Sequence, residues 1–143
     1  MKSFFTPTQE EQILQAIKTA EERTSGEIRV HIESRCKKEP MDRAVELFYS
    51  LGMETTKQRN GVLIYIATSD HKLAIIGDSG INEVVPAGFW NNALDFMRAS
   101  FKKDLFLTGI CGAIELVGEQ LLSYFPYEAN DSNELSNDIS IGE

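Results

Sequence analysis

The sequence predicts one α/β domain, in which amphipathic helices alternate with short strands. Three observations carry this prediction: residues 7–24 repeat apolar side chains at helical spacing, residues 27–33 alternate between apolar and polar, and residues 61–67 are almost entirely apolar. The chain has 143 residues, of which 42% are hydrophobic and 25% charged, as is usual for globular proteins. A domain of this size buries about 70% of the surface of its unfolded chain, which allows a substantial core.

The first helix is predicted to begin at Pro7. Thr6 stands at the N-cap position and Gln9 follows three residues later, which is the spacing of a capping box. One helical face then carries the apolar residues Ile13, Leu14, Ile17 and Ala20. Residues 25–26 (Ser-Gly) end this helix, and the strand of residues 27–33 comes next. On its polar face this strand carries Arg29 and His31.

A second helix is predicted over residues 41–51, because apolar side chains recur every three or four positions and Gly52 then offers a left-handed C-cap. Residues 61–67 (GVLIYIA) are rich in β-branched side chains, which favours a strand covered on both faces. Residues 68–71 form a hairpin connection to an antiparallel strand over residues 72–77. Residues 61–67 should therefore be the central strand.

Two further amphipathic helices are predicted between residues 89 and 122. The last of them contains a long apolar run, but Glu115 and Glu119 lie inside it and would be costly in a bilayer, so we expect no membrane span. Residues 1–126 form the predicted domain. Residues 127–143 are polar and acidic, and we expect this tail to be disordered because it has few apolar side chains to bury.

The formal net charge is −8 at pH 7. Much of it comes from the tail, which has no Lys or Arg and contains Glu128, Asp131, Glu134, Asp138 and Glu143. An acidic balance disfavours nucleic acid as a partner, because phosphodiester backbones repel it. The N-terminus lacks the apolar segment of a signal peptide, so a cytoplasmic location is expected. Cys36 and Cys111 show no metal-ligand spacing and are expected to be reduced thiols.

Residues 77–80 (GDSG) raise the question of a serine nucleophile, because trypsin-like proteases have the same four residues around their nucleophilic serine. That mechanism needs a histidine base beside the serine. His71 lies at the far end of the strand that leads to Ser79, about 20 Å away over about seven residues. His31 lies in mid-strand, where we expect it to be exposed or hydrogen-bonded. A protease is therefore disfavoured, and a turn is the simplest interpretation.

Asp78 is the stronger candidate for function, because a short carboxylate among glycines suits a Ca²⁺ or Mg²⁺ ion. Ser79, Asn82 and Glu83 follow closely and offer further oxygen ligands. The spacing is not that of an EF-hand loop. Metal binding and a solvated turn without a ligand therefore both stay open.

Four features of the chain resemble the TPM domain family. They are TSGEIRVHI (residues 24–32), NGVLIYIATSDHKLAIIGDSGI (residues 60–81), Pro86 after this loop, and FKKDLFLTGICGAI (residues 101–114). The resemblance runs from Phe5 to about Pro126. It implies a three-layer α/β/α sandwich with a short mixed sheet of about four strands and four flanking helices. Residues 81–85 (INEVV) would form the fourth strand.

Members of this family have been described as phosphatases, as divalent-cation binders and as assembly or repair factors for membrane complexes. Secreted members often read Gly-Asp-Tyr-Asp between the last two helices, where this chain has Asp104 followed by Leu105, Phe106 and Leu107. Two carboxylate positions of the family are thus leucine here. The resemblance implies a metal-ligand set of Asp78, Glu83 and Asp104, with Ca or Mg as the cofactor.

Two functions follow from this resemblance. The first is a soluble binding or accessory module with an unknown protein partner, which uses residues 77–83 and the start of the last helix as one surface. The second is a metal-assisted phosphatase, in which Lys102 or Lys103 contacts the phosphate of a small phosphomonoester. The binding residues expected are Ser79, Asn82, Lys102 and Lys103. The small number of convergent carboxylates favours binding over catalysis, and no catalytic residue is assigned.

Overall fold

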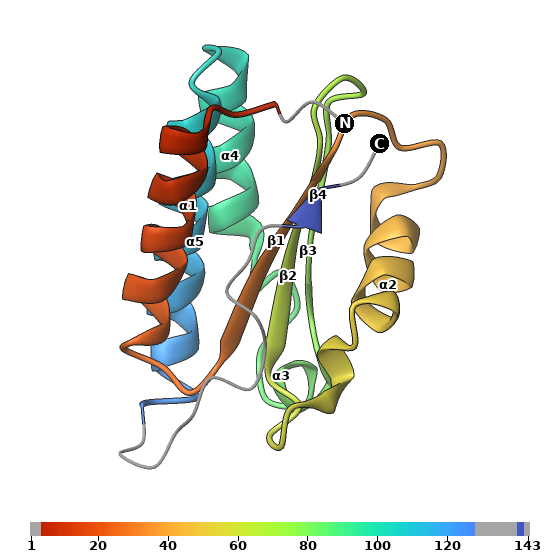
Figure 1. The fold of residues 1–143 in the computed structure, drawn as a ribbon. Coiled ribbons are helices and arrows are strands. Elements are labelled where there is room, and N and C mark those ends of the chain that lie inside the picture. Colours follow the sequence, from red (N-terminus) through yellow and green to blue (C-terminus); the bar gives the residue numbers. More distant parts are fainter. Residues whose placement is uncertain (1–3, 128–139, 142–143) are drawn as a thin grey trace.

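A short mixed sheet forms the middle layer of the fold, and helices cover both of its faces (Figure 1). The computed structural model describes residues 4–127 and 140–141. Three strands make most of the sheet: β1 (Glu27–Glu33), β2 (Gly61–Ala67) and β3 (Lys72–Gly77). β2 lies in the middle, parallel to β1 and antiparallel to β3, and all of its residues are buried. The predicted strands, the hairpin and the central place of β2 are thus confirmed.

The fourth strand expected at residues 81–85 is wrong, and the main sheet has three strands. Residues Ser79–Asn82 form the short helix α3 instead, capped by the side chain of Asp78. A two-residue segment, β4 (Ser140–Ile141), pairs in parallel with β1 at the outer edge of the sheet. Because α3 begins two residues after β3 ends, residues 81–85 add no strand beside β3. Most of the predicted tail, 127–143, lies outside the described residues.

Five α-helices are described rather than the four expected, because α3 adds one. On one face of the sheet lie α1 (Pro7–Glu21), α4 (Asn91–Lys102) and α5 (Phe106–Leu122) (Figure 1). On the other face lies α2 (Pro40–Ser50), followed by the 3-10 turn Met53–Thr55. The predicted capping box of α1 is present, although the helix ends four residues before the predicted Ser-Gly stop. None of the described helices is long and apolar enough to cross a bilayer.

Alternate residues of the strands serve two separate cores. Ile64 of β2 belongs to the larger core, beneath the three-helix layer, with Ile17, Met97 and Val117 of its helices. Its neighbour Tyr65 belongs to the smaller core beneath α2. This is the period of two expected for a strand covered on both faces.

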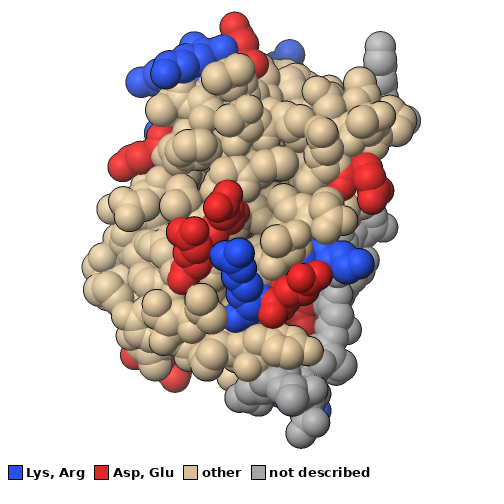
Figure 2. All heavy atoms as spheres, turned by 90° about the vertical axis from the view of Figure 1, so that its left-hand side faces the viewer, with Lys and Arg blue, Asp and Glu red and all other residues tan. Residues whose placement is uncertain are grey.

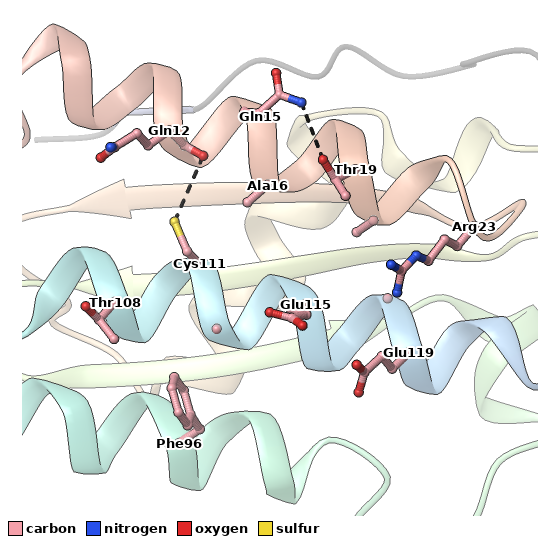
Figure 3. Close-up of a pocket in the computed structure, with 13 residues that line it drawn as sticks. Gln12, Gln15, Ala16, Thr19, Arg23, Phe96, Thr108, Cys111, Glu115 and Glu119 are labelled. Atoms are coloured by element: carbon pink, nitrogen blue, oxygen red, sulfur yellow. Dashed lines mark hydrogen bonds between the residues drawn. The ribbon is translucent and has the colours of Figure 1, made fainter.

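α5 is the middle helix of the three-helix layer, with α1 on one side and α4 on the other (Figure 3). A Cβ atom added at Gly118 would lie 2.9 Å from the Cβ atom of Ala20 in α1. A Cβ atom added at Gly112 would lie 2.1 Å from the ring of Phe96 in α4. Glycine at these positions therefore allows both neighbours to approach the α5 backbone closely, as its lack of a side chain suggests.

Candidate functional site

The predicted metal ligand Asp78 is held by an arginine. Its side chain is 3% exposed and accepts two hydrogen bonds from Arg59, from Nε to Oδ2 at 2.7 Å and from Nη2 to Oδ1 at 2.9 Å. The backbone N–H of Ser79 also donates to Oδ1, at 2.7 Å. These hydrogen bonds to Asp78 raise the pKa of the Arg59 guanidinium. Both carboxylate oxygens are therefore engaged within the chain, by the bidentate geometry typical of arginine and carboxylate.

A close backbone contact places these two side chains together. The N–H of Gly80 donates to the carbonyl oxygen of Arg59 at 2.9 Å, and a Cβ atom at Gly80 would lie 2.1 Å from the carbonyl oxygen of Gln58. Only glycine permits α3 to sit this close to the preceding loop. Arg59 itself has a left-handed φ of 51°. Sequence reasoning missed Arg59, because 19 residues separate it from Asp78 and no local pattern links them.

The other residues expected at this site fall into two separate groups. Ser79, Asn82 and Glu83 lie in or beside α3, where Ser79 and Glu83 are exposed. Nearby, a Cβ atom added at Gly77 would lie 3.2 Å from the ring of Trp90, the residue just before α4. The amide of Asn82 donates to the Gly77 carbonyl at 3.0 Å. This group thus lies near the start of α4.

Lys102, Lys103 and Asp104 lie at the opposite end of α4 (Figure 1). The 12 residues of this helix span about 18 Å. Among the residues that the structure describes, no three His, Cys, Asp or Glu side chains come close enough together to hold a metal ion. The common surface expected from the loop and the start of the last helix is therefore not formed by these residues.

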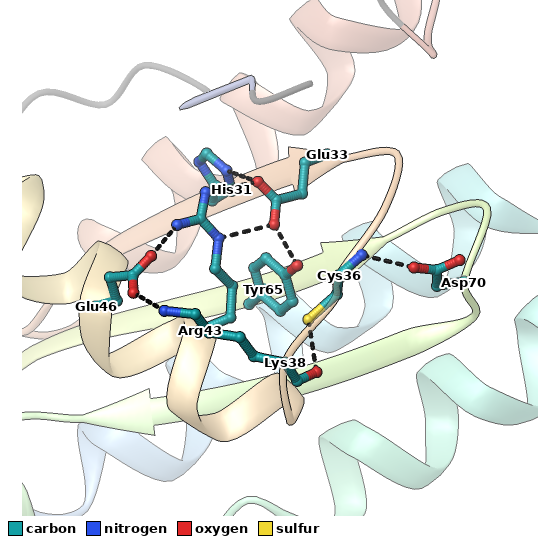
Figure 4. A network of polar contacts seen from close by, with 8 residues as sticks. All are labelled: His31, Glu33, Cys36, Lys38, Arg43, Glu46, Tyr65 and Asp70. Atoms are coloured by element: carbon teal, nitrogen blue, oxygen red, sulfur yellow. Dashed lines mark hydrogen bonds and ion pairs between the residues drawn. The ribbon is translucent and has the colours of Figure 1, made fainter.

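A buried polar network lies on the other face of the sheet, around Glu33 (Figure 4). The Glu33 carboxylate is 3% exposed and accepts from Arg43 Nε at 3.0 Å and from Arg43 Nη2 at 2.9 Å. The Tyr65 hydroxyl donates to it, and His31 Nε2 lies 3.2 Å from Oε1. Burial alone raises the pKa of this carboxyl, but the hydrogen bonds from Arg43, Tyr65 and His31 lower it to about 2.

His31 is hydrogen-bonded, as the sequence predicted, but it is buried rather than exposed. Its ring stacks on Tyr65 with centroids 6.0 Å apart, and burial lowers its pKa. Nδ1 has no hydrogen-bond partner in the described structure. Since Glu33 and His31 are each at most 5% exposed, a substrate has little access to them. The network joins β1, β2 and α2, which makes it a structural feature.

A groove of about 630 Å³ lies over α5, between α1 and α4 (Figure 3). Four of its lining residues have small side chains or none: Ala16, Ala20, Gly112 and Gly118. The α1 side adds Gln12, Gln15, Thr19 and Arg23, α4 adds Phe96, and α5 adds Thr108, Cys111, Glu115 and Glu119. Its volume lies within the range of ligand pockets, about 300 to 1,000 Å³. No local sequence pattern indicated this groove, because its lining residues come from three helices.

The charges of the groove come from few side chains. Glu115 and Glu119 are exposed, and within the described residues neither forms an ion pair. The Arg23 side chain reaches from the end of α1 toward α5 (Figure 3). Figure 2 shows this side of the molecule, where acidic and basic side chains gather near the middle of a broad uncharged area. The Cys111 thiol is half-buried, and burial raises its pKa.

The sequence profile of the TPM domain matches residues 1–120. The chain belongs to the TPM domain family. Its fold is similar to the NMR structure of the BA42 protein from the psychrophilic bacterium Bizionia argentinensis, with 43% sequence identity and a TM-score of 0.92. That alignment covers 99% of this chain and 98% of BA42.

A more distant likeness supports the fold alone. The solution structure of the N-terminal domain of the cg2496 protein from Corynebacterium glutamicum aligns with 12% identity and a TM-score of 0.65, over 95% of this chain and 80% of that domain. Among curated proteins, none matches the chain. The family and the architecture of this TPM domain are thus shown, and its activity is a separate question.

Proposed function

We propose that this TPM domain is a binding or accessory module that holds a protein partner in the groove over α5. The observation that carries this proposal is the groove itself, which is lined by three helices and has a volume of about 630 Å³. Seven of its 13 lining residues carry polar or charged side chains, and the other six are small or apolar. This surface differs from the loop surface that the sequence suggested.

A metal-assisted phosphatase is the rival that the family resemblance implies. It needs a divalent ion, Ca or Mg, held by Asp78 and Glu83, yet Arg59 occupies both carboxylate oxygens of Asp78. It also needs a lysine on the phosphate, yet Lys102 and Lys103 lie at the far end of α4, a helix about 18 Å long. An ion at Asp78 would first have to displace Arg59. The geometry therefore favours the binding module over the phosphatase.

Site-specific photo-crosslinking tests the proposal. A photoreactive residue at Gln15, on the exposed rim of the groove, should give an adduct with one protein in the native cells. The same residue at the exposed Asp42, on α2, should not give this adduct. The partner, once identified and purified, should bind the unmodified chain and should not bind Thr19→Trp, which places an indole on the groove rim.

Two results would overturn the proposal. The first is equal crosslinking at Gln15 and at Asp42, or unchanged partner binding by Thr19→Trp. The second is hydrolysis of a phosphomonoester that depends on Ca²⁺, Mg²⁺ or Mn²⁺ and is lost in Asp78→Ala and Glu83→Ala. That second result would establish the phosphatase instead.

A further inference from the structure

We infer that the groove over α5 receives a basic, amphipathic α-helix of a partner protein. This inference rests on the proposed function and adds the chemistry of the partner to it. Three observations carry it: the shape of the groove, the state of its backbone groups and the signs of its charges.

The shape of the groove suits a helix. α5 is recessed between α1 and α4, because Gly118 lies against Ala20 and Gly112 lies under the ring of Phe96. The lining residues of α5 run from Thr108 to Glu119, a length of about 16 Å. About 11 residues of helix, or three turns, have the same length. A fourth helix laid over α5 would therefore find α1 and α4 as its two neighbours.

The backbone of the groove also favours a helix over an extended segment. All but one of the lining residues belong to α1, α4 or α5, and Arg23 lies just beyond the end of α1. Within these helices the N–H and C=O groups bond to one another. An extended peptide gains its affinity from backbone hydrogen bonds to a sheet edge, which a helical surface does not offer. A helix satisfies its own backbone and needs only side-chain contacts.

The charges select a basic partner. α5 carries Glu115 and Glu119 one turn apart and has no Lys or Arg. Facing them from α1, the lining residues Gln12, Gln15, Ala16, Thr19 and Ala20 are uncharged. The one lining cation, Arg23, reaches toward α5 from just beyond the end of α1, so the lining carries two acids against one base (Figure 3). Two Lys or Arg residues four positions apart on the incoming helix would match the spacing of the two acids. Partial burial in the complex strengthens such pairs and excludes acidic helices.

Labelled model helices test this inference. The probe is a fluorescein-labelled 14-residue helical peptide of Leu and Ala with two Lys residues four positions apart, and its matched control carries Glu in place of Lys. Fluorescence anisotropy with the full chain should show binding of the Lys peptide and at least about tenfold weaker binding of the Glu peptide. The Lys peptide should also bind about tenfold more weakly to Glu115→Gln/Glu119→Gln.

A charge-matched variant separates the groove from general acidity. Glu39→Gln/Glu83→Gln removes two exposed acids that do not line the groove, so its affinity for the Lys peptide should change less than about twofold. Circular dichroism confirms that each variant is folded. Four results would each overturn the inference. Two concern specificity: equal affinity for both peptides, and an equal loss of affinity in the two double variants. The other two are no binding of the Lys peptide at all, and occupation of the groove by a second copy of the chain. If crosslinking at Gln15 still identifies a partner, the proposed function stands without it.

Discussion

Replacing Glu33 by glutamine should destabilise this TPM domain at neutral pH. The carboxylate is 3% exposed, and its pKa in the folded chain is about 2, against 4.5 for an unperturbed glutamate. At about 1.36 kcal/mol per pKa unit, this difference corresponds to about 3 kcal/mol of folding free energy. Removing one partner of a buried ion pair costs about 3 to 5 kcal/mol. Because Arg43 keeps its contact with Glu46, we expect the lower end, about 3 kcal/mol at pH 7.

The same substitution should remove an acid-sensitive part of the stability. The folded state favours the ionised form of Glu33, so its contribution is complete above about pH 4.5 and is lost as the pH falls toward 2. The difference in unfolding free energy between wild type and Glu33→Gln should therefore shrink to about 1.4 kcal/mol at pH 3. Titration of acids that contact neither Glu33 nor Arg43 affects both chains alike and cancels in this difference.

Urea denaturation followed by circular dichroism measures this difference at pH 7, 5 and 3. Glu39→Gln is the matched control, because Glu39 is exposed, and it should stay within about 0.5 kcal/mol of wild type. A Glu33→Gln difference below about 1 kcal/mol at pH 7, or one that does not change with pH, would refute the reasoning.

Three further predictions concern α3, its arginine and the groove thiol. Gly80→Ala places a Cβ atom 2.1 Å from a backbone oxygen, so it should lower the unfolding free energy measured in urea by more than about 2 kcal/mol. Gly52→Ala is the control: there is open space around this position, and its left-handed φ alone should lower the unfolding free energy by about 1 kcal/mol. Arg59→Met frees the Asp78 carboxylate, so millimolar Ca²⁺ or Mg²⁺ should raise the melting temperature of this variant more than that of wild type; equal shifts would contradict the pairing. Cys111 should react with iodoacetamide at pH 7.5 more slowly than free cysteine, because burial raises the pKa of its thiol, and the Lys peptide should slow it further.

Most of the fold could be predicted because its signals are local. The capping box at Thr6, the alternation over Glu27–Glu33 and the apolar run of Gly61–Ala67 each identify an element within a few residues. The strand expected at residues 81–85 failed for a non-local reason. Helix α3 depends on the contact of Gly80 with the loop before β2, which no pattern within that segment reveals.

The site was harder to predict because its residues come from distant parts of the chain. Asp78 was singled out as a candidate metal ligand, but the structure pairs it with Arg59, which gave no sequence signal. Lys102 and Asp104 were grouped with Asp78 although a helix was predicted between them, because the sequence does not show where that helix leads. The groove arises from the packing of α1, α4 and α5, so its residues become neighbours only in the folded chain.

The contacts of α5 divide this helix into positions that differ in how well they tolerate substitution. Gly118 is confined by Ala20, so that position tolerates little change. Glu115 and Glu119 are exposed between the two neighbouring helices and can be exchanged without altering that packing. Descendants of one ancestral scaffold could thus acquire new specificities through a few surface replacements, while the architecture stays the same.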